Sequence, residues 1–430
     1  MRLLRDHCLI LLIVALSAPA AAWPLQDVDS SRARVDSLIR TALTLHSNGL
    51  YVDAIRTFVL AGADTGAPRE RFSLGLSYAA LNDFQQANKL LREAVTLEPD
   101  NVSYRYQLAR FLVQAGAFDE GRSEYERAFR SDSTYIPLLF SLGLLYNDLR
   151  SYDQSARMFR RVLAESPEDY LSYYYLGTVL VALANQDSAQ VCFRTCLTLN
   201  PNFVPAMNVL ASIFYAKKSY ASALTLYREA SALRPDNADL VNKVGLCYRG
   251  LDDYPHAADA FRQATELDSL NDSYFGNLGH AYYRVQKYDS SVFAYRRAIA
   301  IDPDNPLLHV NLALVLQKVD SLQSAVAAFH GAIRAHHPGE IADIYFQLGN
   351  LYFASRKYRE AIQSFDAALR IDSTNAKALW SVASALDDVG DTRAAFRNYQ
   401  KYLKLAENDS LEAKRVEWTK IRMKSLKAKE

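Results

Sequence analysis

Small and aromatic residues recur along this chain with a period of 34 residues. One copy of the unit runs from Asp272 to Asn305, and the same pattern returns when a window slides by 34 residues in either direction. Within the unit, an aromatic residue or Leu is followed nine positions later by a small residue. Another aromatic residue and another small residue come after these. Because a fixed period of this length is typical of stacked repeats, the pattern predicts a helical hairpin as the structural unit.

Eleven copies of the unit align when Asp272 is taken as position 1. Position 8 is small in every copy: Ala42, Gly75, Ala109, Gly143, Gly177, Ala211, Gly245, Gly279, Ala313, Gly349 and Ala383. Position 20 is also small: Ala54, Ala87, Gly121, Ser155, Ala189, Ala223, Ala257, Ser291, Ala325, Ala361 and Ala395. Position 24 is Leu91 in one copy and otherwise aromatic: Phe58, Tyr125, Phe159, Phe193, Tyr227, Phe261, Tyr295, Phe329, Phe365 and Tyr399.

These three positions predict how the two helices of a hairpin pack. Positions 8 and 20 are expected to face each other at the helix crossing, since only a small side chain lets the backbones approach closely. The aromatic at position 24 fills the space beside them, and its burial stabilises the hairpin by about 1.5 to 3 kcal/mol. One hairpin leaves its other faces exposed, so at least three must stack to be stable.

The residues L-G-x-x-Y, then A, F and A, then P, resemble the tetratricopeptide repeat (TPR), a helix-turn-helix of 34 residues. The resemblance covers residues 35–409 and implies an all-α, right-handed superhelical solenoid. The first repeat is expected at Val35. The ten later repeats are expected to begin at Pro68, Val102, Ile136, Tyr170, Val204, Ala238, Asp272, Pro306, Ala342 and Ala376.

The two ends of the chain depart from the repeat. In residues 1–22, Arg2 and Arg5 precede a short apolar run, and Ala20 to Ala22 follow it, which predicts a secretory signal peptide cleaved after Ala22. Residues 23–34 are expected to be a linker. We therefore expect an exported protein, periplasmic or secreted, with no transmembrane segment in the mature chain.

The last segment, residues 410–430, is expected to form a basic helix that caps the open end of the stack. It contains apolar residues such as Leu411 and Trp418 among seven Lys or Arg. An alternative role for this helix is contact with an anionic surface such as a membrane.

Composition limits the possible functions. Hydrophobic residues make up 50% and charged residues 23% of the chain, as in a folded protein. The balance of 49 Lys and Arg against 48 Asp and Glu argues against nucleic-acid binding. No phosphate loop, H-E-x-x-H, G-x-S-x-G or C-x-x-C motif is present. We therefore expect no enzymatic activity, no cofactor and no metal site.

In proteins that this chain resembles, positions 2, 5, 9 and 12 of the first helix line a concave groove that binds peptides or partner helices. Carried over to this chain, those positions give a predicted partner-binding groove of Phe72, Tyr106, Arg110, Phe140, Asn147, Tyr174, Asn208, Tyr215, Asn242, Arg249, His280, Tyr283, Phe346, Asn350, Phe353 and Trp380. The family's chaperone-binding clamp requires Lys at position 5 with Asn at position 9, and no copy here has that pair.

The sequence thus predicts a non-catalytic scaffold that binds a protein or peptide partner in the groove, in the cell envelope or outside the cell. Aromatic side chains with Asn and Arg beside them suit peptide recognition, since rings supply contact area and polar groups satisfy a backbone. Two alternatives remain open. The same aromatic groove suits a glycan, and the chain could also be a non-catalytic subunit of a transferase or protease complex.

Overall fold

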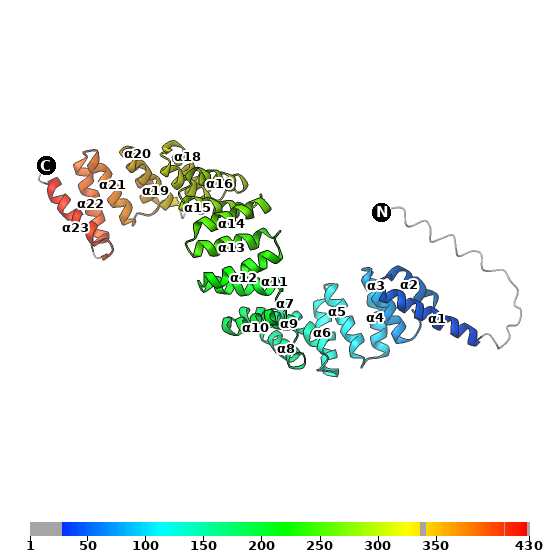
Figure 1. Cartoon of the computed structure of the whole chain (residues 1–430). Helices are drawn as coiled ribbons and strands as arrows, with labels where there is room; N and C mark the ends of the chain where they lie inside the picture. The colour runs from blue at the N-terminus through cyan, green and yellow to red at the C-terminus, as the bar shows by residue number, and fades with distance from the viewer. Residues whose placement is uncertain (1–27, 336–340, 408, 428–430) are drawn as a thin grey trace. The chain divides into compact units, whose positions relative to one another are not determined.

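The structure, a computed structural model, describes residues 28–335, 341–407 and 409–427. These ranges contain 23 α-helices and no β-strand (Figure 1). The predicted all-α fold is confirmed. The expected signal peptide, residues 1–22, lies outside the described residues.

The chain divides into two compact units, Met1–Cys192 and Phe193–Glu430, with the boundary inside α10. The helices up to that boundary are α1 (Val28–Ser47), α2 (Tyr51–Leu60), α3 (Pro68–Ala80), α4 (Phe84–Leu97), α5 (Val102–Gln114), α6 (Phe118–Ser131), α7 (Ile136–Asp148), α8 (Tyr152–Glu165), α9 (Tyr170–Ala182) and α10 (Gln186–Leu199).

The second unit continues with α11 (Val204–Ala216), α12 (Tyr220–Leu233), α13 (Ala238–Gly250), α14 (Tyr254–Leu267), α15 (Asp272–Arg284), α16 (Tyr288–Ile301), α17 (Pro306–Lys318), α18 (Leu322–Ala335), α19 (Ile341–Ala354), α20 (Tyr358–Ile371), α21 (Ala376–Asp388), α22 (Thr392–Ala406) and α23 (Ala413–Lys427). Odd-numbered helices up to α21 are the first helices of their hairpins, and even-numbered helices are the second helices.

The helix boundaries agree closely with the repeat pattern. Nine of the ten later first helices begin at the predicted residue, and α19 begins at Ile341, one residue before Ala342. The first helix differs, because α1 begins at Val28 and residues 28–34 are therefore helical rather than a linker. The terminal helix, α23, spans Ala413–Lys427 and begins three residues later than expected.

The packing inside each hairpin follows from positions 8, 20 and 24. In the first unit, Ser155 Oγ on α8 donates to the Gly143 carbonyl on α7 at 2.7 Å. A Cβ atom at Gly143 would lie 2.8 Å from the ring of Phe159, so no side chain fits there without a shift of that ring. Ser291 and Gly279 repeat this hydrogen bond in the second unit at 2.7 Å. The small residues thus allow the close helix crossing that the sequence predicts.

The turn inside each hairpin has a conformation that the repeat pattern did not predict. The residue at position 15 adopts the left-handed conformation throughout the described repeats, with φ of 53° to 61° at the eight copies that are not glycine. Those eight residues are Asn82, Arg150, Ala184, Lys218, Asp252, Gln286, Asp320 and Arg356. Most of these turns therefore adopt a backbone conformation that is unfavourable for residues with a Cβ atom.

Candidate functional site

The sixteen predicted groove residues lie on the first helices, at positions 5, 9 and 12 of their repeats. First helices of successive hairpins contact one another within each unit, as α7 and α9 do in the first unit and α15 and α17 do in the second. In each unit the first helices therefore form a continuous surface, which we call the first-helix face. The structure separates the predicted residues into those that remain accessible on this face and those that hold the hairpins together.

Two predicted aromatic residues of the first unit belong to the core. Phe72 is 9% exposed, and its ring stacks on Tyr104 of the next hairpin with the centroids 4.2 Å apart. Tyr106 is 8% exposed and packs against Tyr125 and Tyr135, with centroids 5.9 and 5.6 Å away. Neighbouring aromatic rings thus cover most of Phe72 and Tyr106, and the contact of these two residues with a partner stays a prediction.

The other predicted residues of the first unit keep some exposure. Phe140 is half-buried and meets the rings of Phe159 and Tyr175 edge-on, with both centroids 5.6 Å away. Tyr174 is also half-buried and has its centroid 5.2 Å from that of Tyr175. Asn147 is half-buried as well, and Arg110 is exposed. These rings combine a packing role with an accessible edge.

A cavity of about 250 Å³ lies beside Arg110 in the first unit. Its lining includes His46, Tyr51 and Gln107, which are not among the predicted groove residues, although His46 occupies position 12 of the first repeat. The Nδ1 of His46 lies 2.8 Å from Ser77 Oγ, and burial lowers the pKa of this imidazole. The cavity is therefore a recess of mixed polar and apolar lining at the start of the repeat array, with Arg110 as its cationic side chain.

In the second unit, three predicted rings at position 12 are paired within their own hairpins. The partner in each case is the tyrosine at position 17, five residues later. The centroid distances are 5.2 Å for Tyr215 and Tyr220, 5.9 Å for Tyr283 and Tyr288, and 5.4 Å for Phe353 and Tyr358. Tyr215, Tyr283 and Phe353 all remain half-buried. The pairing fixes these rings while leaving part of each ring on the first-helix face.

Polar side chains join successive first helices of the second unit. Lys243 Nζ on α13 donates to Asn208 Oδ1 on α11 at 3.0 Å. One hairpin later, Asn277 Nδ2 on α15 donates to Asn242 Oδ1 on α13 at 3.1 Å, and Arg249 Nη1 donates to Asn277 Oδ1 at 3.0 Å. Asn242 is buried, and its amide oxygen positions Asn277, so its contact with a partner stays a prediction.

A cationic cluster surrounds His280 on the same face. Burial lowers the pKa of His280, and the charges of Arg249 and Arg284 lower it further. The Nδ1 atom of this imidazole is enclosed and has no hydrogen-bond partner among the described residues. Arg284 lies over the ring of Tyr254, 3.9 Å from its centroid, and the hydroxyl of Tyr254 donates to Asp252 at 3.0 Å. The two guanidinium groups are thus held next to a neutral histidine.

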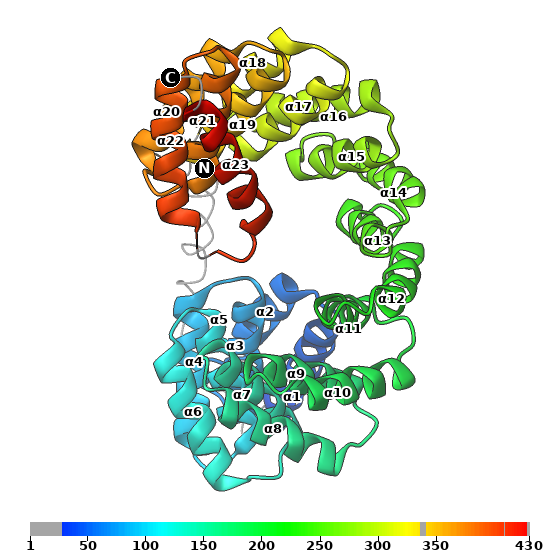
Figure 2. The ribbon, with the colours of Figure 1, turned by 90° about the vertical axis from the view of Figure 1, so that its left-hand side faces the viewer.

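The last predicted residue, Trp380, is engaged by the chain's own C-terminal helix. Trp380 Nε1 on α21 donates to Thr419 Oγ1 on α23 at 3.2 Å. The guanidinium of Arg415 lies 5.1 Å from the Trp380 ring centroid, and the Trp418 ring lies edge-on at 5.7 Å. Figure 2 shows α23 beside α21 and α22. Because α23 already contacts this half-buried ring, the contact of Trp380 with a partner stays a prediction.

Two further predicted residues lie on α19. Phe346 is half-buried, and its ring centroid is 5.7 Å from that of Phe365. Asn350 is exposed. Both remain on the first-helix face. The accessible part of the site in the second unit therefore extends from Asn208 to Phe353 and ends before α21.

Several kinds of site are not found in the part of the chain that the structure describes. No group of three or more His, Cys, Asp or Glu side chains suited to a metal ion occurs there. Cys192, Cys196 and Cys247 are each buried. None of the described helices is both long and apolar enough to span a membrane.

The fold and the first-helix face define a class of protein, the α-helical repeat scaffolds. Tetratricopeptide repeat models match residues 78–139, 140–192, 208–272 and 342–375, and a TPR repeat model matches residues 279–320. Together these matches cover more than half of the chain. The protein belongs to the tetratricopeptide repeat family.

Solved structures of TPR proteins resemble this chain. The C-terminal part of a TPR repeat-containing protein from Cytophaga hutchinsonii matches with a TM-score of 0.50 and 17% identity, over 56% of this chain and 99% of that one. Yeast Tom70 matches with a TM-score of 0.37 and 16% identity, over 93% of this chain and 96% of that one. YrrB, a TPR protein with an unusual peptide-binding site, matches with a TM-score of 0.40 and 17% identity, over 47% of this chain and 99% of that one. The comparison with curated proteins gave no match.

Proposed function

We propose that this protein is a non-catalytic scaffold that holds a partner polypeptide against the first-helix face of its second unit. The observation that carries the proposal is the row of half-buried polar and aromatic side chains across α11, α13 and α15, each held in place by a contact within the chain. Asn208, Asn277 and Arg249 are fixed by hydrogen bonds, and Tyr215 and Tyr283 by ring pairs. A face that is ordered before binding costs less conformational entropy when a partner docks.

The chemistry of this face indicates the kind of partner. Amide groups such as that of Asn277 can satisfy a peptide backbone, and the exposed edges of the tyrosines supply apolar contact area. The charges of Arg249 and Arg284 both act on His280, and Arg284 also pairs with Asp252, so an acidic side chain of the partner would find positive charge there, chiefly from Arg249. The partner is therefore a polypeptide with at least one acidic residue.

This proposal can be tested with a library of random 12-residue peptides displayed on phage and selected on the full chain. Peptides that are selected should bind about tenfold or more weakly to the double variant Arg249→Ala/Tyr283→Ala, since one charged and one aromatic contact are removed. The matched control is Arg228→Ala/Phe293→Ala, which removes the same side-chain types from exposed positions on α12 and α16. Equal binding to all three proteins contradicts the proposal.

A glycan array run on the same proteins distinguishes peptide binding from the main alternative, which is glycan binding. Binding to glycans without binding to any peptide, with loss of glycan binding in Arg249→Ala/Tyr283→Ala, supports a saccharide-binding function instead.

We also propose that the scaffold acts outside the cytosol, in the cell envelope or secreted. The support is the sequence of residues 1–22, where Arg2 and Arg5 precede an apolar run and a small-residue cleavage site. Mass spectrometry of the protein from its native host should show a mature chain that starts at Trp23. An intact chain that begins at Met1 in the cytosolic fraction contradicts this proposal.

A further inference from the structure

A second, chemically different recess lies on the second helices of the last two repeats. A cleft of about 590 Å³ opens between α20 and α22, helices that Figure 2 shows close to each other. Its lining combines three leucines with three cationic side chains: Leu369, Leu379, Leu405, Arg370, Lys401 and Lys404. None of these residues belongs to the predicted groove, which lies on the first helices.

The equivalent cleft between α6 and α8 in the first unit is filled by the chain itself. Arg161 on α8 lies over the ring of Phe129, 4.9 Å from its centroid, and donates to the backbone carbonyl of Ser133. This arginine occupies position 26 of its repeat, and Phe129 and Ser133 occupy positions 28 and 32 of the preceding one. A long side chain from one hairpin thus covers the gap between two second helices.

The cleft between α20 and α22 has the same turn but lacks this arginine. Position 26 is Lys401, and the residues equivalent to Phe129 and Ser133 are Leu369 and Ser373. The turn sequence Asp-Ser-Thr is identical at 132–134 and 372–374, and in both copies the Thr hydroxyl donates to the Asp carboxylate at 2.7 Å. The backbone turn is thus the same in the two places, whereas the side chains at positions 26 and 28 differ.

The charges around the cleft are not neutralised within the described chain. Arg370, Lys401 and Lys404 form no ion pair with a described residue, and Asp366 is the one acidic residue in the lining. Burial in the cleft raises the pKa of the Asp366 carboxyl, even though Arg370 and Lys401 act in the opposite direction. With three cationic side chains and one carboxyl in its lining, the cleft carries an excess of positive charge that suits an external anion.

We propose that this cleft binds a short acidic segment of a partner polypeptide that carries a leucine-like side chain. The leucine floor accepts the aliphatic group, and Arg370, Lys401 and Lys404 accept carboxylates at the rim. On α22 the lining runs from Asn398 to Leu405, a rise of about 10 Å or two helical turns, and on α20 it runs from Asp366 to Arg370. Because Leu405 is 49% exposed, a single alkyl chain would stay partly in water, so a polypeptide segment fits better than a fatty acid.

The test uses the full chain and an acetylated, amidated peptide of sequence Glu-Leu-Leu-Glu-Glu-Leu-Glu, followed by fluorescence anisotropy. The variant Lys401→Glu/Lys404→Glu should weaken binding about tenfold or more, because two attractive charges become repulsive. The matched control Lys287→Glu/Lys357→Glu makes the same charge change at exposed turn positions of the second unit and should bind as the wild type does. Circular dichroism checks that each variant is folded.

A charge-conserving variant makes the test sharper. Lys401→Arg restores the arginine that fills the equivalent cleft between α6 and α8, so it should weaken peptide binding about fivefold although the net charge is unchanged. Unchanged binding in both Lys401→Glu/Lys404→Glu and Lys401→Arg overturns the proposal. Competition by decanoate with an affinity equal to that of the peptide also overturns it, since the cleft would then be a fatty-acid site. The variant Arg249→Ala/Tyr283→Ala should leave this binding intact, so the two proposals can fail independently.

Discussion

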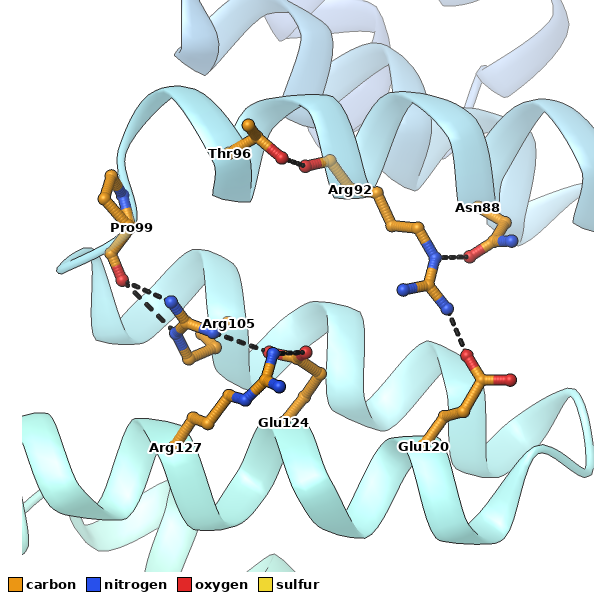
Figure 3. Close-up of polar contacts among 8 residues, drawn as sticks. All are labelled: Asn88, Arg92, Thr96, Pro99, Arg105, Glu120, Glu124 and Arg127. Carbon is orange, nitrogen blue, oxygen red and sulfur yellow. Dashed lines mark hydrogen bonds and ion pairs between the residues drawn. The ribbon is translucent and has the colours of Figure 1, made fainter.

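Arg105 on α5 donates a hydrogen bond from Nη1 to Oε2 of Glu124 on α6 at 2.8 Å (Figure 3). The Nε and Nη2 atoms of the same guanidinium reach the carbonyl of Pro99, in the turn before α5, at 3.2 and 2.7 Å. Arg127 Nη1 donates to Oε1 of Glu124 at 2.9 Å. One carboxylate thus joins both helices of its hairpin to the turn between two repeats.

Replacement of Glu124 by Gln should destabilise the first unit by about 2 kcal/mol, because the charges of Arg105 and Arg127 would lose their shared carboxylate in a poorly solvated place. The Glu124 side chain is 10% exposed. The matched control is Glu120→Gln, whose side chain is 61% exposed and pairs with Arg92, and it should cost less than about 1 kcal/mol. Hydrogen exchange of the α5 and α6 amides measures both effects. Equal losses of protection in the two variants would show that the stability cost does not depend on the burial of the carboxylate.

The left-handed turns predict a stabilising substitution. Ala184 has φ of 59°, a conformation that costs a residue with a Cβ about 1 to 2 kcal/mol and glycine much less. Ala184→Gly should therefore increase the free energy of unfolding by about 0.5 kcal/mol, after the greater entropy of glycine in the unfolded chain is subtracted. The control is Ala182→Gly, two residues earlier at the last residue of α9, which should destabilise by less than about 1 kcal/mol, the cost of glycine in a helix interior. Urea unfolding followed by circular dichroism gives the sign of each change.

The pKa of His280 makes the stability of the second unit depend on pH. Burial and the charges of Arg249 and Arg284 lower this pKa in the folded state below its ordinary value of 6.5. Between the two pKa values the unfolded chain binds more protons than the folded chain, so the contribution of His280 to stability is fully present above pH 6.5 and is lost as the pH falls through the lowered folded pKa.

An NMR titration of His280 checks this directly. The variant Arg249→Gln should raise the pKa of His280, because one repulsive charge is removed. Binding of an acidic peptide to the first-helix face should raise it as well. A pKa of His280 at or above 6.5 in the free wild-type chain would contradict the placement of the two arginines beside it.

Removal of residues 408–430 should expose Trp380 and loosen the last repeat. The helix α23 buries Val416 and Leu426, and its Arg422 forms two hydrogen bonds with Asp387 on α21, at 2.6 and 2.7 Å. Loss of the two apolar side chains alone should lower the stability of α21 and α22 by about 3 kcal/mol. Tryptophan emission should shift to longer wavelength. The control Ile421→Ala changes a side chain that is 63% exposed, and it should leave stability unchanged.

The position of the repeats was predictable from the sequence, because it depends on local sterics. A small residue at Gly279 or Gly349 is required wherever the aromatic at position 24 lies against the helix crossing, so the pattern marks the hairpin almost to the residue. The helical residues before Val35 follow no repeat, and the sequence therefore gave no sign that α1 begins at Val28.

The candidate site was predictable only in part, since side chains from other hairpins decide which groove positions stay accessible. Position 5 is aromatic at Phe72, Phe140 and Trp380, yet Tyr104 covers the first of these rings and α23 covers the last. The 34-residue period of the sequence predicts on which face of its helix each position lies. Its exposure, and the open cleft at Lys401, depend on contacts between residues in different repeats, which only the tertiary structure brings together.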